Sequence, residues 1–102
     1  YGFPGGTFGP GWLSVGTNPL GYNGSWAPCG DHTSGSGNQL IVDGHTSANA
    51  KVWCQTVSVS PGKTYLFRFY VQSVFPAAPC QLNVLANNTS FGSVQGGALA
   101  NL

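Results

Sequence analysis

Residues 51–73 carry the pattern that most constrains how this chain can fold. Residues 51–60 are rich in Val, Thr and Trp, and Ser60-Pro61-Gly62-Lys63 has the composition of a tight turn. From residue 64 onward, side chains alternate between two faces of a strand, with Tyr65, Phe67, Phe69 and Val71 on one face and Leu66, Arg68, Tyr70 and Gln72 on the other. This period of two predicts an antiparallel β-hairpin whose second strand is half-buried.

The rest of the chain predicts further strands and no helix. Residues 1–38 are dense in Gly and Pro, which disfavour helix and predict short irregular strands within packed loops. Residues 39–43 and 81–86 predict two more strands, and a turn at Asn87-Asn88 follows the second. We therefore expect one all-β domain over residues 1–102, an antiparallel β-sandwich with its core strands in residues 39–92 and a tail in residues 93–102.

The low charge of the chain excludes several functional classes. Its five charged residues are Lys51, Lys63, Arg68, Asp31 and Asp43, and the formal net charge is +1. Three cations cannot form the basic stripe of a nucleic-acid-binding protein, and no apolar run approaches the roughly 18 residues of a membrane span. A surface of hydroxyls and amides predicts a secreted or cell-surface protein without membrane insertion. Charge near zero also favours assembly, because it weakens self-repulsion.

The three cysteines form an odd set, Cys29, Cys54 and Cys80. Their spacing matches no zinc-binding pattern, and an oxidising compartment favours one disulfide with one leftover thiol. The hairpin places Cys54 towards its open end, and the chain returns to that end to begin the next strand at Cys80. We therefore favour a Cys54–Cys80 disulfide. A pairing with Cys29, or cysteines that act only as small apolar side chains, are the alternatives.

Four segments together resemble a known family: Gly30-Asp31-His32-Thr33, Gly37-Asn38-Gln39-Leu40-Ile41-Val42-Asp43-Gly44, Val52-Trp53-Cys54-Gln55-Thr56-Val57-Ser58-Val59, and Thr64-Tyr65-Leu66-Phe67 with Tyr70-Val71. In order and spacing they resemble a galactose-binding-like jelly-roll module of secreted and surface proteins from Bacteroidetes-type bacteria. Such modules are similar to carbohydrate-binding modules of the 4/9/22 type. The resemblance covers about residues 22–92 and implies a jelly-roll sandwich.

The chain departs from that family at its end. Such modules close with an Asp-rich strand, whereas no acidic residue follows Asp43 here. The resemblance therefore implies an incomplete jelly roll, whose terminal strand lies elsewhere or comes from a neighbour. A sandwich that lacks a strand has an exposed edge, and exposed edges pair with other chains.

The polar loop before residue 39 is the candidate metal site. The resemblance implies a structural calcium ion nearby, and Asp31, Thr33 and Asn38 offer the oxygen ligands that calcium prefers. The alternative is that Asp31 and His32 cap the loop through hydrogen bonds to its backbone. Asp31 and Asp43 are also the only carboxylates, one in a loop and one at a strand end, which is a poor match to a glycosidase pair. We predict no enzymatic activity.

A glycan-binding patch is the candidate ligand site. Tyr70, Arg68 and Gln72 share one face of the hairpin, and Trp26 is a further aromatic platform, whereas Trp53 shares a face with apolar residues and is expected in the core. The alternative for the patch is a solvated or interface face. These residues predict a non-catalytic extracellular module for glycan binding or surface adhesion. The alternative is a structural subunit of a self-assembling cell-surface fibre or layer, completed by strand exchange with a neighbouring copy or with the parent protein.

Overall fold

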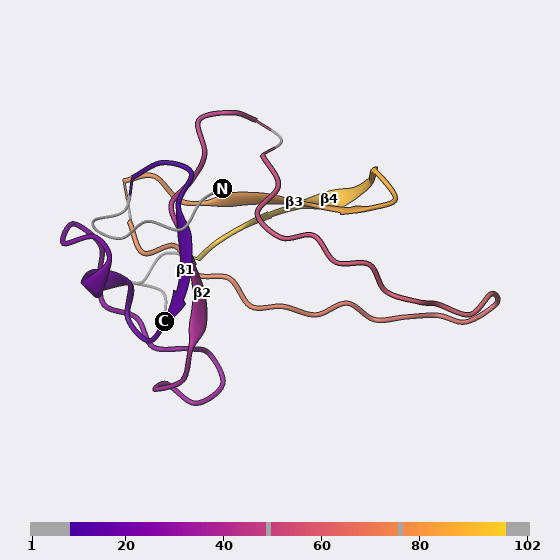
Figure 1. The fold of residues 1–102 in the computed structure, drawn as a ribbon, viewed down its shortest axis with the longest axis horizontal. Coiled ribbons are helices and arrows are strands. Elements are labelled where there is room, and N and C mark those ends of the chain that lie inside the picture. The colour runs from indigo at the N-terminus through magenta and orange to yellow at the C-terminus, as the bar shows by residue number, and fades with distance from the viewer. Residues whose placement is uncertain (1–8, 49, 76, 98–102) are drawn as a thin grey trace.

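The computed structural model describes residues 9–48, 50–75 and 77–97. Its elements are β1 (Leu13–Gly16), the short 3₁₀ helix η1 (Pro19–Gly21), β2 (Gln39–Val42), β3 (Gln81–Ala86) and β4 (Thr89–Gln95). β1 pairs with β2 and β3 pairs with β4, each antiparallel, so the described ranges hold two separate two-stranded sheets and no α-helix (Figure 1). This confirms a mostly β fold but not a sandwich. Residues 1–8 of the predicted loop-rich segment and residues 98–102 of the predicted tail lie outside these ranges.

The first sheet is short, and a helical turn closes one end of it. Leu13 pairs with Val42 and Gly16 with Gln39, which confirms a strand at the predicted position. After β1, the side chain of Asn18 accepts a hydrogen bond from the N–H of Leu20 (3.1 Å), which caps η1. η1 turns the chain back, and the Tyr22 hydroxyl then donates to the carbonyl of Val15 at 3.3 Å.

The second sheet is a tight hairpin with a bulge. Asn87 and Asn88 both have positive φ (49° and 63°), which suits a two-residue turn between twisted strands and confirms the predicted Asn87-Asn88 turn. The register shifts between Val84 and Leu85, so that Phe91 is the extra residue on β4. Its neighbour Gly92 has φ 128°, a value that side chains rarely tolerate. β4 continues to Gln95 and so occupies part of the predicted tail.

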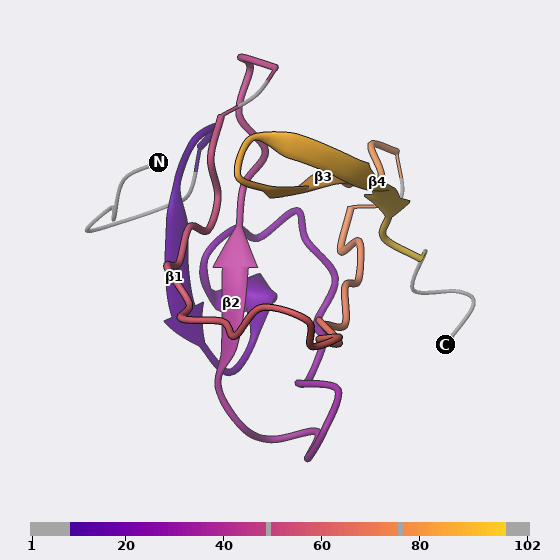
Figure 2. The same ribbon diagram turned by 90° about the vertical axis from the view of Figure 1, so that its right-hand side faces the viewer.

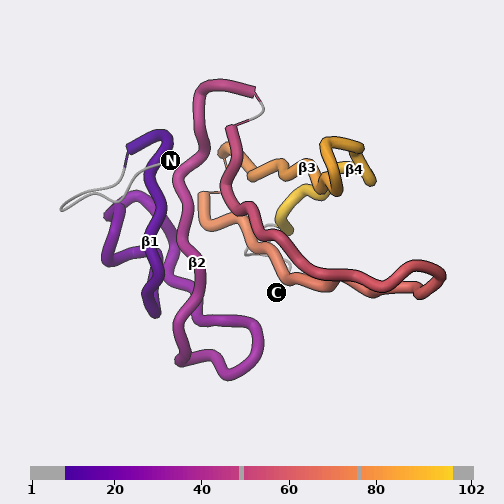
Figure 3. Tube along the Cα trace, turned by 45° about the vertical axis from the view of Figure 1, so that its right-hand side comes forward, coloured from indigo at the N-terminus to yellow at the C-terminus, as the bar shows by residue number. Residues whose placement is uncertain are grey.

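The predicted hairpin over residues 51–73 has the expected turn but not the expected hydrogen-bonded strands. The chain turns at Pro61-Gly62, and two extended segments run side by side away from the sheets (Figures 1 and 3). We call residues 52–71 the arm. No backbone hydrogen bond joins its two segments, and the contact near its tip is from the Ser60 N–H to the Tyr65 hydroxyl (2.8 Å). The strand prediction is therefore wrong here, because a two-stranded hairpin without a sheet beneath it is marginal.

The core is small and lies against the first sheet. Leu13, Trp26 and Ile41 are buried, and Tyr22 and Val74 pack on the Trp26–Ile41 pair. Figure 2 shows β3 and β4 crossing beyond the end of β2, so the two sheets do not stack face to face. Within the described ranges, no helical segment has the length and apolar character needed to span a bilayer.

A pair of tryptophan variants tests this account of the core. Trp26→Ala removes a ring that is 8% exposed and should lower the free energy of unfolding by about 3–5 kcal/mol, because it leaves a cavity. Trp53→Ala removes a ring that is 70% exposed and should change it by less than about 0.5 kcal/mol in dilute protein. Urea unfolding of both variants provides the comparison. Equal losses would contradict the core described here.

Candidate interaction surface

The loop before β2 is organised around the Asp31 carboxylate. Oδ2 accepts hydrogen bonds from the N–H groups of Thr33 (3.1 Å) and Ser34 (2.9 Å), and Oδ1 accepts from the Ser34 hydroxyl (2.7 Å) and the Gly37 N–H (2.6 Å). The two bonds from Ser34, followed by the one from Gly37, hold the pKa of Asp31 well below its ordinary value. Asp31 therefore caps this loop, as one of the two sequence interpretations proposed.

The predicted calcium ligands Asp31, Thr33 and Asn38 lie in or beside this loop. Each carboxylate oxygen of Asp31 already accepts two hydrogen bonds, and Thr33 contributes an N–H donor to that carboxylate. Asn38 is exposed immediately before β2. No cluster of three His, Cys, Asp or Glu side chains that could hold a metal occurs in the described part of the chain. Backbone N–H groups and the Ser34 hydroxyl hold the loop around Asp31, and the calcium site stays a prediction.

The predicted glycan-binding residues do not form one open patch. Trp26 lies in the core, so neither face of its ring is free to stack on a sugar. The Gln72 amide donates to the Gly97 carbonyl, and the Tyr70 ring stacks on His32 with centroids 3.4 Å apart and an interplanar angle of 8°. Arg68 is exposed on the arm. The alternation of the sequence placed Arg68, Tyr70 and Gln72 on one face but could not show which of them other groups would engage.

The arm presents most of the exposed apolar surface. Seven of its large apolar side chains are between 56% and 81% exposed: Trp53, Val57, Val59, Tyr65, Leu66, Phe67 and Tyr70. The rings of Phe67 and Phe69 lie 5.3 Å apart and tilted, so they form a continuous aromatic surface. The expectation that Trp53 belongs to the core is wrong, because in the described ranges no second layer of structure covers the extended segment that carries it.

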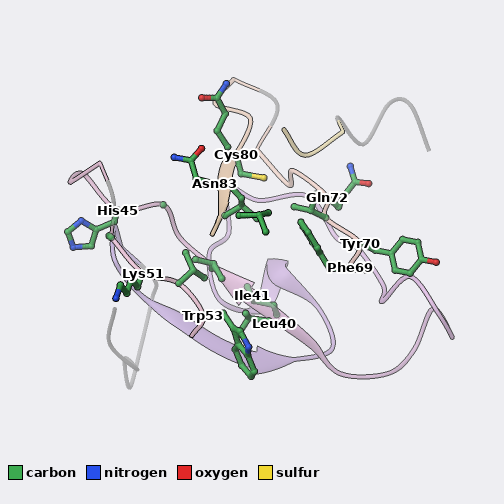
Figure 4. A pocket seen from close by; sticks show the side chains of 18 of the residues that line it. Leu40, Ile41, His45, Lys51, Trp53, Phe69, Tyr70, Gln72, Cys80 and Asn83 are labelled. Carbon is green, nitrogen blue, oxygen red and sulfur yellow. The ribbon is translucent and has the colours of Figure 1, made fainter. Parts of the chain in front are cut away.

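A broad hollow separates the arm from the two sheets. It has a volume of about 3090 Å³ and is lined by β2, by β3 with the start of β4, and by one face of the arm (Figure 4). Figure 4 shows Asn83 and Cys80 on one side of the hollow and Leu40 and Trp53 on the other. The arm side chains that line it include Val57, Val59, Tyr65, Phe67 and Phe69, whereas Ser58, Leu66 and Arg68 do not. Towards its tip the arm thus has an inner and an outer face, as the period of two predicted, whereas near its base Tyr70, Val71 and Gln72 all line the hollow.

All three cysteines are free thiols, so the predicted Cys54–Cys80 disulfide is not formed. Cys80 is half-buried at the start of β3, where its N–H donates to the Ser73 hydroxyl (2.9 Å) and its Sγ lies 3.4 Å from that oxygen. The same hydroxyl donates to the Gly96 carbonyl at 3.1 Å. Cys54 is exposed on the arm, which extends away from this cluster.

Asp43, the second carboxylate, also lines the hollow. It follows β2, and its N–H donates to the Trp12 carbonyl at 2.8 Å. Burial raises the pKa of its carboxyl group, while a hydrogen bond from the Gly44 N–H acts in the opposite direction. Asp43 thus joins Asp31 and Lys51 as a charged residue in a lining that is otherwise largely apolar.

Comparison with known proteins adds no relative. No protein-family model matches the chain, and neither a curated protein nor a solved structure is similar to it. Any function proposed for the chain therefore depends on its own geometry.

The Asp31 loop has a measurable acid response. Because the folded pKa lies below the ordinary value of about 3.9, the charged carboxylate stabilises the loop above that pH, and this contribution is lost as pH falls through the lower folded pKa. The Gly37 amide resonance, followed by NMR, should titrate with a midpoint clearly below the ordinary value. Asp31→Asn should remove the titration. A midpoint near 3.9 would contradict the loop geometry.

Proposed function

We propose that this chain is a non-catalytic extracellular adhesion module that contacts its partners through the arm. The observation that carries this proposal is the set of seven exposed apolar side chains on residues 52–71. Soluble monomers rarely expose contiguous apolar patches beyond a few hundred Å², and larger patches mark interaction sites. A surface of this kind is expected to be covered when the protein performs its function.

The backbone of the arm supports the same proposal. Between residues 51 and 72, no backbone hydrogen bond pairs the N–H and C=O groups of the two extended segments with each other. Extended segments with unpaired backbone groups are templates for another strand. β-strand addition uses these groups for affinity and the alternating side chains for specificity.

The hydrogen bonds that the Asp31 carboxylate accepts support a non-catalytic role. Hydrolysis of a glycosidic bond needs two carboxyl groups that flank the bond and are free to exchange protons. Both oxygens of Asp31 are committed to the loop, so Asp43 has no free carboxylate as its partner. The low charge of the chain supports an extracellular setting, where hydroxyl and amide groups provide the wetted surface.

The finer fold belongs to the same proposal. We propose that β1–β2, the arm and β3–β4 are parts of a jelly roll whose layers are completed by a partner. The arm and β3–β4 extend from the same side of β1–β2, with their facing sides lining the hollow (Figures 1 and 3). Two sheets of a sandwich face each other across side chains that interdigitate. Here the space between these elements is open.

Glycan binding is the second candidate function. Trp53 and Tyr65 expose aromatic rings on the arm, and Arg68 is an exposed cation on the same element. Aromatic faces stack on the apolar faces of sugars, and a guanidinium group donates hydrogen bonds to their oxygens. This candidate uses the same element of the chain, so one experiment addresses both candidates.

An adhesion assay tests the proposal. Beads that carry the full chain are placed on surfaces coated with the chain itself, with candidate surface proteins or with an oligosaccharide panel. The double variant Phe67→Asp/Phe69→Asp should reduce bead retention at least about tenfold, because charges on this surface lose hydration when it is covered. Leu20→Asp is the control, since Leu20 is an exposed apolar residue outside the arm.

The surface that retains the beads distinguishes the two candidates. Retention on oligosaccharides alone would support glycan binding, and retention on protein-coated surfaces would support protein adhesion. Retention of the double variant equal to that of the unaltered chain would overturn the role of the arm. Tryptophan fluorescence, to which the buried Trp26 contributes together with the exposed Trp12 and Trp53, checks that both variants are folded.

A further inference from the structure

We infer that the hollow receives the arm of a second copy of this chain, so that two copies exchange arms reciprocally. The inference depends on the proposed function, in which the arm is the contact surface. It goes further by naming both the occupant and the place where the occupant binds. Four observations carry it: the size of the hollow, the pattern of the arm, the area that the arm exposes and the distribution of charge.

The size of the hollow points to a length of polypeptide as its occupant. Small-molecule sites have volumes of roughly 300–1,000 Å³. The hollow, at about 3090 Å³, is several times larger than that range. The hollow is open to solvent, so its largely apolar lining is uncovered in a single copy. A sugar or cofactor would leave most of the space unfilled, whereas an inserted hairpin brings enough side chains to fill it.

The second segment of the arm has apolar side chains on both of its faces. A strand placed between two other layers is covered on both faces, which favours apolar side chains on each. Residues 64–71 carry Tyr65, Phe67 and Phe69 on one face, while the other face carries Leu66 and Tyr70 together with the polar Thr64 and Arg68. In a single copy, Leu66 is 81% exposed and does not line the hollow. Exchange of arms gives that outer face a cover that one copy alone does not provide.

The exposed area of the arm is sufficient for a stable pair. Seven side chains that are each more than half exposed amount to on the order of 700 Å², because large apolar side chains bury on the order of 150–250 Å² each. A standard interface buries about 800 Å² on each partner. Reciprocal exchange uses the arm twice, once from each copy, and so reaches that size.

The charges are placed so that they favour the exchange. The arm carries two cations, Arg68 in its second segment and Lys63 in its turn, and contains no carboxylate. The hollow is lined by the carboxyl groups of Asp31 and Asp43 and by one cation, Lys51. Because its carboxyl groups outnumber its cation, the hollow of a neighbour attracts a cationic arm. The net charge of +1 keeps the repulsion between two copies small.

A mixing experiment tests the exchange. Leu66→Asp damages the outer face of the arm and leaves the hollow of that copy available to another arm, because Leu66 does not line it, whereas Asn83→Lys damages the hollow at an exposed β3 residue and leaves the arm intact. Sedimentation velocity should show the unaltered chain as a dimer, with each variant alone associating about thirty-fold more weakly. An equimolar mixture of the two variants should recover dimers, because one intact arm can still enter one intact hollow. Ser25→Lys, an exposed polar residue outside the hollow, is the control and should dimerise normally.

Each outcome of the mixing experiment either supports or contradicts the exchange of arms. Recovery in the mixture supports exchange. Two variants that remain monomeric when mixed, or an unaltered chain that is monomeric at every concentration, would overturn it. In either of those cases, the bead assay could still support the adhesion function. Retention of beads on other proteins or on oligosaccharides would then show that the partner is not a second copy. Urea unfolding of each variant, followed by tryptophan fluorescence, shows whether it has folded.

Discussion

The covering of apolar surface is the constraint on which the rest of this structure depends. Leu13, Trp26 and Ile41 are the buried apolar residues of the core in the described ranges, while the arm and β4 expose aromatic rings such as those of Phe67 and Phe91. Because hydrophobic burial is the dominant favourable contribution to folding, a chain that leaves so much apolar surface uncovered gains stability from a partner. The open hollow and the exposed arm both arise because no other part of the described chain covers these apolar side chains.

The base of the arm shows how the exposed element is attached to the rest of the chain. Tyr70 stacks on His32, which belongs to the loop that Asp31 organises, and Gln72 bonds to the backbone at Gly97. Beyond these contacts the arm extends without a sheet beneath it. The loop therefore contributes to function indirectly, because it fixes one end of an element whose remainder is available to a partner.

Local signals in the sequence predicted the local features of the fold. The strand at residues 39–42, the strand beginning at Gln81, the Asn87-Asn88 turn and the turn at Pro61-Gly62 follow from side-chain periodicity and turn chemistry. The burial of Trp26 and the exposure of Trp53 were missed. A period of two reports which side chains share a face, but not whether another layer covers that face. Likewise, the oxygen atoms around Asp31 suggested calcium, whereas backbone N–H groups, which every loop residue has, satisfy the carboxylate.

The central claim is that the arm is uncovered in one copy and covered by a second. Amide hydrogen exchange of residues 52–71, measured over a series of protein concentrations, tests it most directly. The account predicts that these amides exchange at nearly unprotected rates in dilute protein and become protected as concentration rises, while the amides of β1–β2 stay protected throughout. Protection of the arm that is already complete in dilute protein would contradict the account, as would an arm that remains unprotected at every concentration.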